Sequence, residues 1–168
     1  RAIGVSNETS WGLIQFINAT KQYENLCVAS IQNEYSLLCR LYDTDMSEIS
    51  HHENIPLLSY SPLAGGILTG KYLNNAIPEN SRMSRIPKVF GRVNSRSLRA
   101  VQEYLNLSRK YEIDPVHLAL NFCKKKPFMG SIIFGATTNE QLDKIIKGIN
   151  INLSDDIMSE IDEINKKF

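Results

Sequence analysis

The chain has 168 residues, of which 42% are hydrophobic and 22% charged, and its formal net charge is +1. This length is sufficient for one domain with a hydrophobic core, and no apolar run approaches the roughly 20 residues that a membrane span requires. The near-neutral charge gives no support for a nucleic acid or a membrane surface as partner. We therefore expect a soluble, cytoplasmic protein.

The first half of the chain alternates short apolar runs with helical patterns. The run at residues 2–5 ends in Ser6-Asn7, and a helix is expected at about 10–24 with Trp11, Ile17 and Tyr23 on its apolar stripe. A second run at 27–31 is followed by a polar helix at about 43–53. The third run, at 55–60, leads into a segment rich in glycine.

The second half begins with a long irregular stretch at 73–94, followed by expected helices at 95–111 and 115–126. Asp114-Pro115 is a strong helix-start signal, an N-cap with proline at the first helical position. The fourth apolar run, at 131–134, precedes a helix that opens at Thr138, and Ser154 caps the last helix. Six basic residues and no acidic ones lie between Glu79 and Glu103: Arg82, Arg85, Lys88, Arg92, Arg96 and Arg99.

These elements amount to a strand–helix unit repeated four times, which indicates an α/β fold with parallel strands. Because each run is short and apolar throughout, we expect strands buried on both faces. Two architectures fit: an open doubly wound sheet, or half of an eight-stranded barrel. No GxGxxG motif follows any strand, and this favours the half barrel.

The segment at 59–72 contains a proline, three glycines and Lys71 directly after the third strand. Glycines let the backbone approach a ligand closely, and a lysine at the far end suits a phosphate-bearing ligand. An ordinary glycine-rich turn is the alternative interpretation. The three cysteines, Cys27, Cys39 and Cys123, are too far apart for a zinc motif, so we expect free thiols and no metal site.

Four motifs occur in a fixed order: Gly4-Val5-Ser6-Asn7, Gln32-Asn33-Glu34-Tyr35-Ser36, Tyr60 to Gly66 with Gly70-Lys71-Tyr72, and Gly135-Ala136-Thr137. In this order the sequence resembles the aldo-keto reductase superfamily, near its Tas-type oxidoreductases and potassium channel β-subunits. The resemblance covers the whole chain as strands five to eight of a (β/α)8 TIM barrel, with their helices and carboxyl-terminal tail. It implies that residues 1–168 form the C-terminal part of a single barrel domain within a longer polypeptide.

The resemblance also implies an NADP(H) site across the carboxyl face of the barrel. The residues that would contact the nicotinamide carboxamide are Ser6, Asn7 and Gln32, with Tyr60 stacked on the ring. Those that would hold the pyrophosphate are Ser61, Leu63, Gly66 and Lys71, with Arg82 clasping a phosphate. Those that would meet the adenine and its 2′-phosphate at a helix N-terminus are Thr137 and Gln141.

Each of these assignments has a plain structural alternative. Ser6-Asn7 is also a turn with a helix cap, Tyr60 a packed core residue, and Gln32 a satisfied buried amide. Thr138 and Gln141 also fit a capping box.

The sequence departs from the family pattern near the adenine, where Lys144 and Ile145 replace an acidic residue and an asparagine. We expect weaker adenine contacts, with Lys144 adding charge that favours NADP over NAD.

By resemblance, the function is NADP(H)-dependent reduction of small aldehydes or ketones by hydride transfer. The family's general acid is a tyrosine tuned by a lysine, an aspartate and a histidine, and none of the four matches this chain, so no catalytic residue is assigned here. Two alternatives remain. One is a nucleotide-binding, redox-sensing module like the channel β-subunits, and the other is structural: an inactive truncated fragment, or a half barrel that dimerises into a pseudo-complete one. The chain is expected to need its N-terminal half barrel, while substrate identity and oligomeric state stay open. Residues 73–94 are expected to clamp the cofactor through Arg82.

Overall fold

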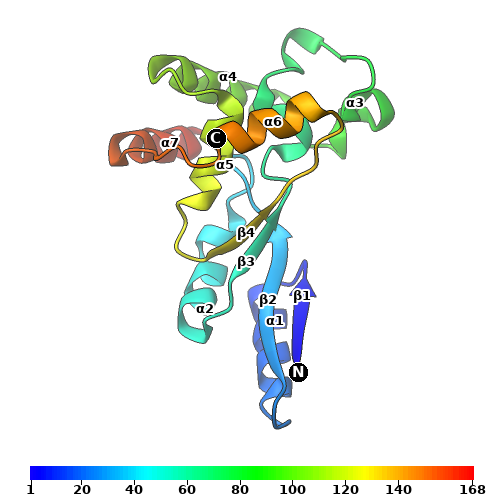
Figure 1. Cartoon of the computed structure of the whole chain (residues 1–168), viewed down its shortest axis with the longest axis vertical. Coiled ribbons are helices and arrows are strands. Elements are labelled where there is room, and N and C mark those ends of the chain that lie inside the picture. The colour runs from blue at the N-terminus through cyan, green and yellow to red at the C-terminus, as the bar shows by residue number, and fades with distance from the viewer.

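The computed structural model describes residues 1–168 as four strands and seven α-helices joined by loops and short 3₁₀ turns. Figure 1 shows their arrangement. The elements in chain order are β1 (Ala2–Ser6), α1 (Ser10–Thr20), β2 (Cys27–Glu34), α2 (Asp45–Glu53), β3 (Leu57–Tyr60), α3 (Arg82–Arg85), α4 (Ser95–Lys110), α5 (Pro115–Lys124), β4 (Met129–Ile133), α6 (Asn139–Gly148) and α7 (Asp155–Lys167).

The strands form one parallel sheet in the order β1-β2-β3-β4. Each strand therefore pairs only with its neighbours in the sequence. A doubly wound sheet reverses its strand order at a switch point, and this sheet does not. The predicted α/β fold is confirmed, with the strand sequence of half a (β/α)8 barrel.

The register aligns the carboxyl ends of the strands. Gln32 pairs with both Ser6 of β1 and Leu58 of β3, and Tyr60 pairs with both Glu34 of β2 and Ile133 of β4. Polar residues that lie far apart in the sequence therefore meet at one edge of the sheet.

Helices of this chain cover one face of the sheet. Leu57 and Ser59 of β3 are fully buried, whereas the alternate residues Leu58 and Tyr60 are half-buried, and Ile133 of β4 is 40% exposed. Since side chains alternate across a strand, every second residue points away from the helices. The expectation of strands buried on both faces is therefore wrong.

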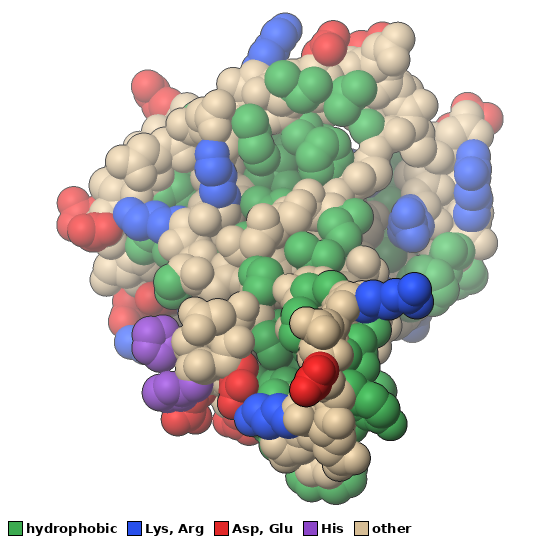
Figure 2. Space-filling model, turned by 60° about the horizontal axis from the view of Figure 1, so that its bottom comes forward, with side chains coloured by type: hydrophobic (Ala, Val, Ile, Leu, Met, Phe, Trp, Pro, Cys, Tyr) green, Lys and Arg blue, Asp and Glu red, His purple; other side chains and the backbone are tan.

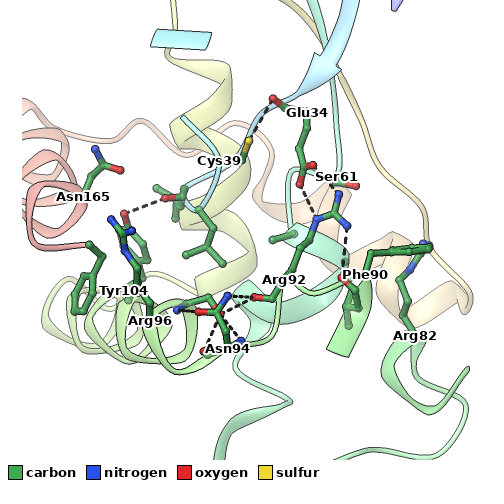
Figure 3. A pocket seen from close by; sticks show the side chains of 18 of the residues that line it. Glu34, Cys39, Ser61, Arg82, Phe90, Arg92, Asn94, Arg96, Tyr104 and Asn165 are labelled. Atoms are coloured by element: carbon green, nitrogen blue, oxygen red, sulfur yellow. Dashed lines mark hydrogen bonds and ion pairs between the residues drawn. The ribbon is translucent and has the colours of Figure 1, made fainter. Parts of the chain in front are cut away.

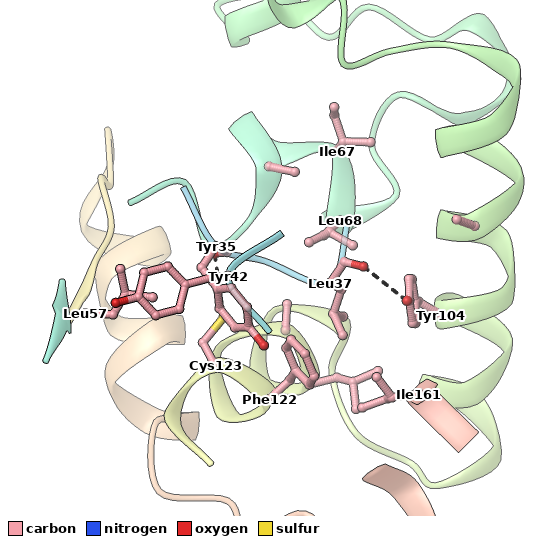
Figure 4. Packing of buried hydrophobic residues seen from close by; sticks show 14 of the residues in the cluster. Tyr35, Leu37, Tyr42, Leu57, Ile67, Leu68, Tyr104, Phe122, Cys123 and Ile161 are labelled. Atoms are coloured by element: carbon pink, nitrogen blue, oxygen red, sulfur yellow. Dashed lines mark hydrogen bonds between the residues drawn. The ribbon is translucent and has the colours of Figure 1, made fainter. Parts of the chain in front are cut away.

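The core draws buried residues from the sheet and from helices α1, α2, α4, α5 and α7, and is rich in aromatic rings (Figure 4). The rings of Tyr35 and Phe122 stack with centroids 5.7 Å apart, and Phe128 meets Tyr35 edge-on at 5.4 Å. The Tyr35 hydroxyl donates to Asp43, which also accepts from Arg40 at 2.6 Å. Burial, reinforced by the bond to Asp43, raises the pKa of Tyr35 far above its usual value.

The helix caps at Asp114 and Ser154 are confirmed, since their side chains accept from Val116 N at 2.9 Å and Ile157 N at 3.4 Å. Helix α1, however, ends at Thr20, four residues earlier than expected. Tyr23 thus lies outside the helix.

Two strands also differ from the sequence prediction. Strand β2 runs to residue 34 because backbone pairing with β1 and β3 does not require apolar side chains. Strand β4 begins two residues early, at Met129.

Large hydrophobic side chains are exposed on the surface (Figure 2). The most exposed are Leu41, Trp11, Phe90, Tyr23, Ile77 and Ile146. Trp11 is 74% exposed, so the predicted apolar stripe of α1 is only partly buried, through Ile17. Leu13, which the predicted stripe did not include, is fully buried. No helix combines the length and apolar composition that crossing a membrane would need.

Candidate functional site

The segment after β3 turns sharply through four residues with left-handed backbone, three of them consecutive. Ser61 and Ala64 have φ values of 54° and 50°, and Gly65 and Gly66 follow with 69° and 93°. A Cβ at Gly66 would lie 2.8 Å from Cε and 3.0 Å from Nζ of Lys71. Glycine at this position therefore lets the Lys71 ammonium lie directly against the backbone of the turn.

This turn forms one wall of a cavity of about 580 Å³. The other walls come from the 73–94 segment and from the loop between β4 and α6. Seven of the residues predicted from the sequence to bind a cofactor line it: Ser61, Leu63, Gly66, Lys71, Arg82, Thr137 and Gln141.

Positive charge dominates this cavity. Lys71, Arg82 and Lys144 line it, against the single carboxylate of Glu79. Lys144 is paired with Asp114 at 2.7 Å, while Lys71 and Arg82 form no ion pair within the chain. Two unpaired cations beside an exposed glycine backbone fit an anionic group such as the phosphates of a dinucleotide.

The far wall of the cavity is the start of α6. Thr138 caps the helix by accepting from Gln141 N at 3.3 Å, and Gln141 Oε1 accepts from Thr137 N at 3.0 Å. The helix-cap interpretation is thus confirmed, although the returning bond reaches Thr137 rather than Thr138. The same residues face the cavity, so capping and ligand contact are compatible.

The remaining four predicted residues gather at the ends of β1, β2 and β3. The Gln32 carbonyl accepts from Ser6 Oγ at 2.9 Å and Asn7 N at 3.0 Å. The Tyr60 hydroxyl donates to Asn7 Oδ1 at 2.7 Å. These residues form a connected polar group beside the cavity rather than within it.

The structure also tests the plain structural alternatives for this group. Thr9, not Ser6 or Asn7, caps α1 by accepting from Gly12 N at 3.1 Å. Tyr60 and Gln32 are half-buried, so neither is a fully enclosed core residue. Burial raises the pKa of Tyr60, and the nearby Glu34 carboxylate raises it further, which keeps the phenol protonated and its ring neutral.

An ion pair between Glu34 and Arg92, which the sequence analysis did not identify, ties the 73–94 segment to β2 (Figure 3). Arg92 Nε donates to Glu34 Oε1 at 2.8 Å, and Nη2 donates to Oε2 at 2.6 Å. The bond to Glu34 raises the pKa of Arg92. The sequence signal was the run of basic residues, which did not indicate which of them has an acidic partner.

The same segment packs onto the glycine-rich turn. Val89, in the 3₁₀ turn Pro87–Val89, is fully buried, and a Cβ at Gly65 would lie 2.5 Å from its Cγ1. Residues 73–94 therefore fold back over the turn and hold Arg82 at the cavity.

A second cavity, of about 890 Å³, is lined by the later part of this segment, at residues 82–94 (Figure 3). It shares Ser61, Gly65 and Arg82 with the first cavity and also includes Tyr60. No group of three or more histidine, cysteine, aspartate or glutamate side chains is arranged to hold a metal ion.

The sequence model of the Aldo/keto reductase family matches residues 1–166. The chain is 36% identical over its full length to "Protein tas" of Escherichia coli, covering 49% of that protein. It is 36% identical to an "Aldo-keto reductase" of Babesia bovis, across 98% of this chain and 61% of the relative. It is 30% identical to an "NADH-specific methylglyoxal reductase" of Escherichia coli, across 92% of this chain and 45% of that relative. The chain thus spans about half the length of the curated relatives that it matches.

Proposed function

The chain belongs to the aldo/keto reductase family, and on this basis we propose that it provides most of the NADP(H) site of an oxidoreductase that reduces small aldehydes or ketones. The observation that supports this proposal best is the positively charged cavity. It brings together seven residues from three separate segments, and its two unpaired cations flank a glycine backbone.

The proposed phosphate contacts divide between the turn and the 73–94 segment. Lys71 neutralises the pyrophosphate across Gly66, whose bare backbone lets an anionic oxygen approach. Ser61 and Leu63 line the same wall, and Arg82 reaches the phosphates from the opposite side. The Glu34–Arg92 pair holds that side in place.

At the other end of the cavity, Thr137 and Gln141 contact the adenosine, and Lys144 lies near the 2′-phosphate. Lys144 already has a carboxylate partner in Asp114. A 2′-phosphate would therefore share this ammonium with Asp114, which favours NADP over NAD by a modest margin.

At the strand ends, Ser6, Asn7 and Gln32 offer donors and acceptors for a carboxamide, and Tyr60 offers a neutral ring for stacking. When bound, NADPH supplies the hydride. The protonation of the substrate oxygen needs a general acid, and we place that group in the part of the relatives that this chain does not cover.

The test is a titration of the natural polypeptide with NADPH and with NADH, followed by nicotinamide fluorescence. We expect NADPH to bind more tightly, and Arg82→Ala to weaken both nucleotides about tenfold or more, since a charge-assisted bond contributes about 1.5–3 kcal/mol. NADPH oxidation by aldehydes would establish the reaction.

Substitutions of two lysines of α6 provide a matched test and control for the proposed contact with the 2′-phosphate. Lys144→Gln should weaken NADPH binding and leave NADH binding unchanged. Lys147→Gln, on the same helix and outside the cavity, should change the affinity for neither nucleotide. If neither nucleotide binds the natural polypeptide, the proposal fails.

A further inference from the structure

The second cavity adjoins the proposed cofactor site at its phosphate-binding side, and its wall also includes the residue proposed to stack on the nicotinamide. The two cavities meet at Ser61, Gly65 and Arg82, and Tyr60 stands in the wall of the second. If Tyr60 stacks on the nicotinamide as proposed, a molecule in this cavity has one end near the ring. The volume of about 890 Å³ is in the range of small-molecule sites.

Much of the cavity wall is apolar. Leu37, Ala64, Val89 and Ala100 contribute to it, and each is at most 3% exposed, so this wall is fixed by the core. The Tyr104 hydroxyl, which also lies here, donates to the Leu37 carbonyl at 3.1 Å and is satisfied. These surfaces favour a ligand with a hydrocarbon or aromatic body.

The charges of the cavity are unbalanced. Three arginines line it, Arg82, Arg92 and Arg96, against the carboxylate of Glu34. Both oxygens of Glu34 accept from Arg92, so that pair is neutral. Arg82 and Arg96 form no ion pair within the chain.

The two unpaired arginines lie at opposite ends of the cavity (Figure 3). Arg82 is at the end shared with the cofactor cavity, where the proposed phosphates occupy it. Arg96, at the start of α4, is at the far end beside Tyr104 and Asn165. It therefore remains available to an anionic group on a second ligand.

We infer that this cavity holds the body of the carbonyl substrate and that Arg96 binds an anionic group, a carboxylate or a phosphate, at the substrate's distal end. The inference rests on the proposed function and adds the substrate class. A guanidinium forms paired hydrogen bonds with either anion, which makes Arg96 a residue that determines specificity.

The test measures binding and reaction separately on the natural polypeptide. Calorimetry with NADP present compares three alcohol products: benzyl alcohol, 4-(hydroxymethyl)benzoate and 4-(hydroxymethyl)phenyl phosphate. NADPH oxidation is then followed with the corresponding aldehydes. Arg99→Gln is the matched control for Arg96→Gln, because Arg99 is on the same helix and does not itself line the cavity. Its guanidinium lies over the ring of Phe168, so the control also measures the effect of disturbing that part of the wall.

We expect at least one anionic alcohol to bind about tenfold or more tightly than benzyl alcohol, with the better anion identifying the group. Arg96→Gln should remove this preference, and Arg99→Gln should retain it. Equal binding of all three alcohols, or equal loss in both variants, would overturn the inference. Selective binding without oxidation of NADPH by any aldehyde would contradict the proposed function and leave the anion site standing.

Discussion

Gly66 combines a backbone conformation and a close contact that a larger residue cannot reproduce. Its φ is +93°, and an added Cβ would meet the end of Lys71. We expect Gly66→Ala to reduce stability by roughly 1–2 kcal/mol through the left-handed backbone and to displace Lys71, which weakens NADPH binding. Urea unfolding and nucleotide titration measure the two effects.

Gly91→Ala is the control for this variant. Gly91 also has a positive φ, +81°, but open space lies where its Cβ would be. The backbone cost should therefore be similar in both variants, and the loss of nucleotide affinity should appear only at Gly66. An equal loss of affinity in both would show that Lys71 is not positioned by the turn.

Tyr104 makes stability sensitive to alkaline pH. Burial raises its pKa from 10.0 to about 12, so above pH 10 the unfolded chain releases a proton that the folded chain retains. Stability from this residue is complete below pH 10 and falls as the pH rises to about 12. The loss at pH 11 is on the order of 1 kcal/mol.

The matching variant is Tyr104→Phe, which removes the titrating hydroxyl together with its bond to Leu37. Urea unfolding at pH 9 and pH 11 should show a smaller decrease for the variant than for the natural residue. Tyr35 retains its own raised pKa in both proteins, so some decrease remains. An identical decrease in both proteins would mean that Tyr104 is not the source of the stability lost between pH 9 and pH 11.

At the scale of elements, the contact between α5 and α6 positions the far wall of the proposed cofactor cavity. His117 of α5 forms a hydrogen bond with the Lys144 carbonyl at 2.7 Å, and its ring lies against Gly148. A Cβ at Gly148 would overlap that ring. We expect Gly148→Ala to destabilise the protein by about 1–3 kcal/mol, as overpacking does.

Gly148→Ala should also weaken NADPH binding, because displacing α6 moves Gln141 and Lys144. His117→Ala with Gly148→Ala removes the clash, and thermal unfolding should show partial recovery relative to Gly148→Ala alone. If the double variant is no more stable than Gly148→Ala, the loss of stability does not come from a clash with the His117 ring but from the helix backbone.

Helix starts were readily predicted from the sequence because a side-chain cap is a local signal. Asp114 and Ser154 are examples, since each bonds to a backbone amide two or three residues away. The end of α1 has no such signal, and the exposure of Trp11 depends on what packs against the helix. Tertiary contacts of this kind cannot be read from periodicity.

The candidate site likewise has a part that the sequence predicts locally and a part that depends on contacts between distant residues. The glycine-rich turn and Lys71 lie within one segment, and their order in the sequence indicated their role. The Glu34–Arg92 pair joins positions 58 residues apart, and among six basic residues nothing local distinguishes Arg92. The cavity that contains Arg96 likewise exists only once α4 has packed against the 73–94 segment.

At the scale of the whole molecule, β1 and β4 are the edges of the sheet, and alternate side chains of the strands face away from the helices. Open strand edges and exposed apolar residues favour association. We expect residues 1–168, produced alone, to sediment as dimers or larger species. A monodisperse monomer of 19.0 kDa in analytical ultracentrifugation would contradict this.

Intact mass spectrometry of the natural polypeptide complements that experiment. The relatives lead us to expect a mass roughly twice that of this chain, as for a barrel of ordinary size. A mass near 19.0 kDa would weaken the reductase proposal, since no general acid is assigned within these residues.

The order of strands in the sheet bears on how the protein is made. Because each strand pairs only with its neighbours in the sequence, each strand from β2 onward leaves the ribosome after its partner on one side has been synthesised. The sheet can therefore grow one strand at a time in the direction of translation, without waiting for a distant segment. The glycine-rich turn then forms before Arg82 emerges to cover it, so ligand capture is among the later events of folding.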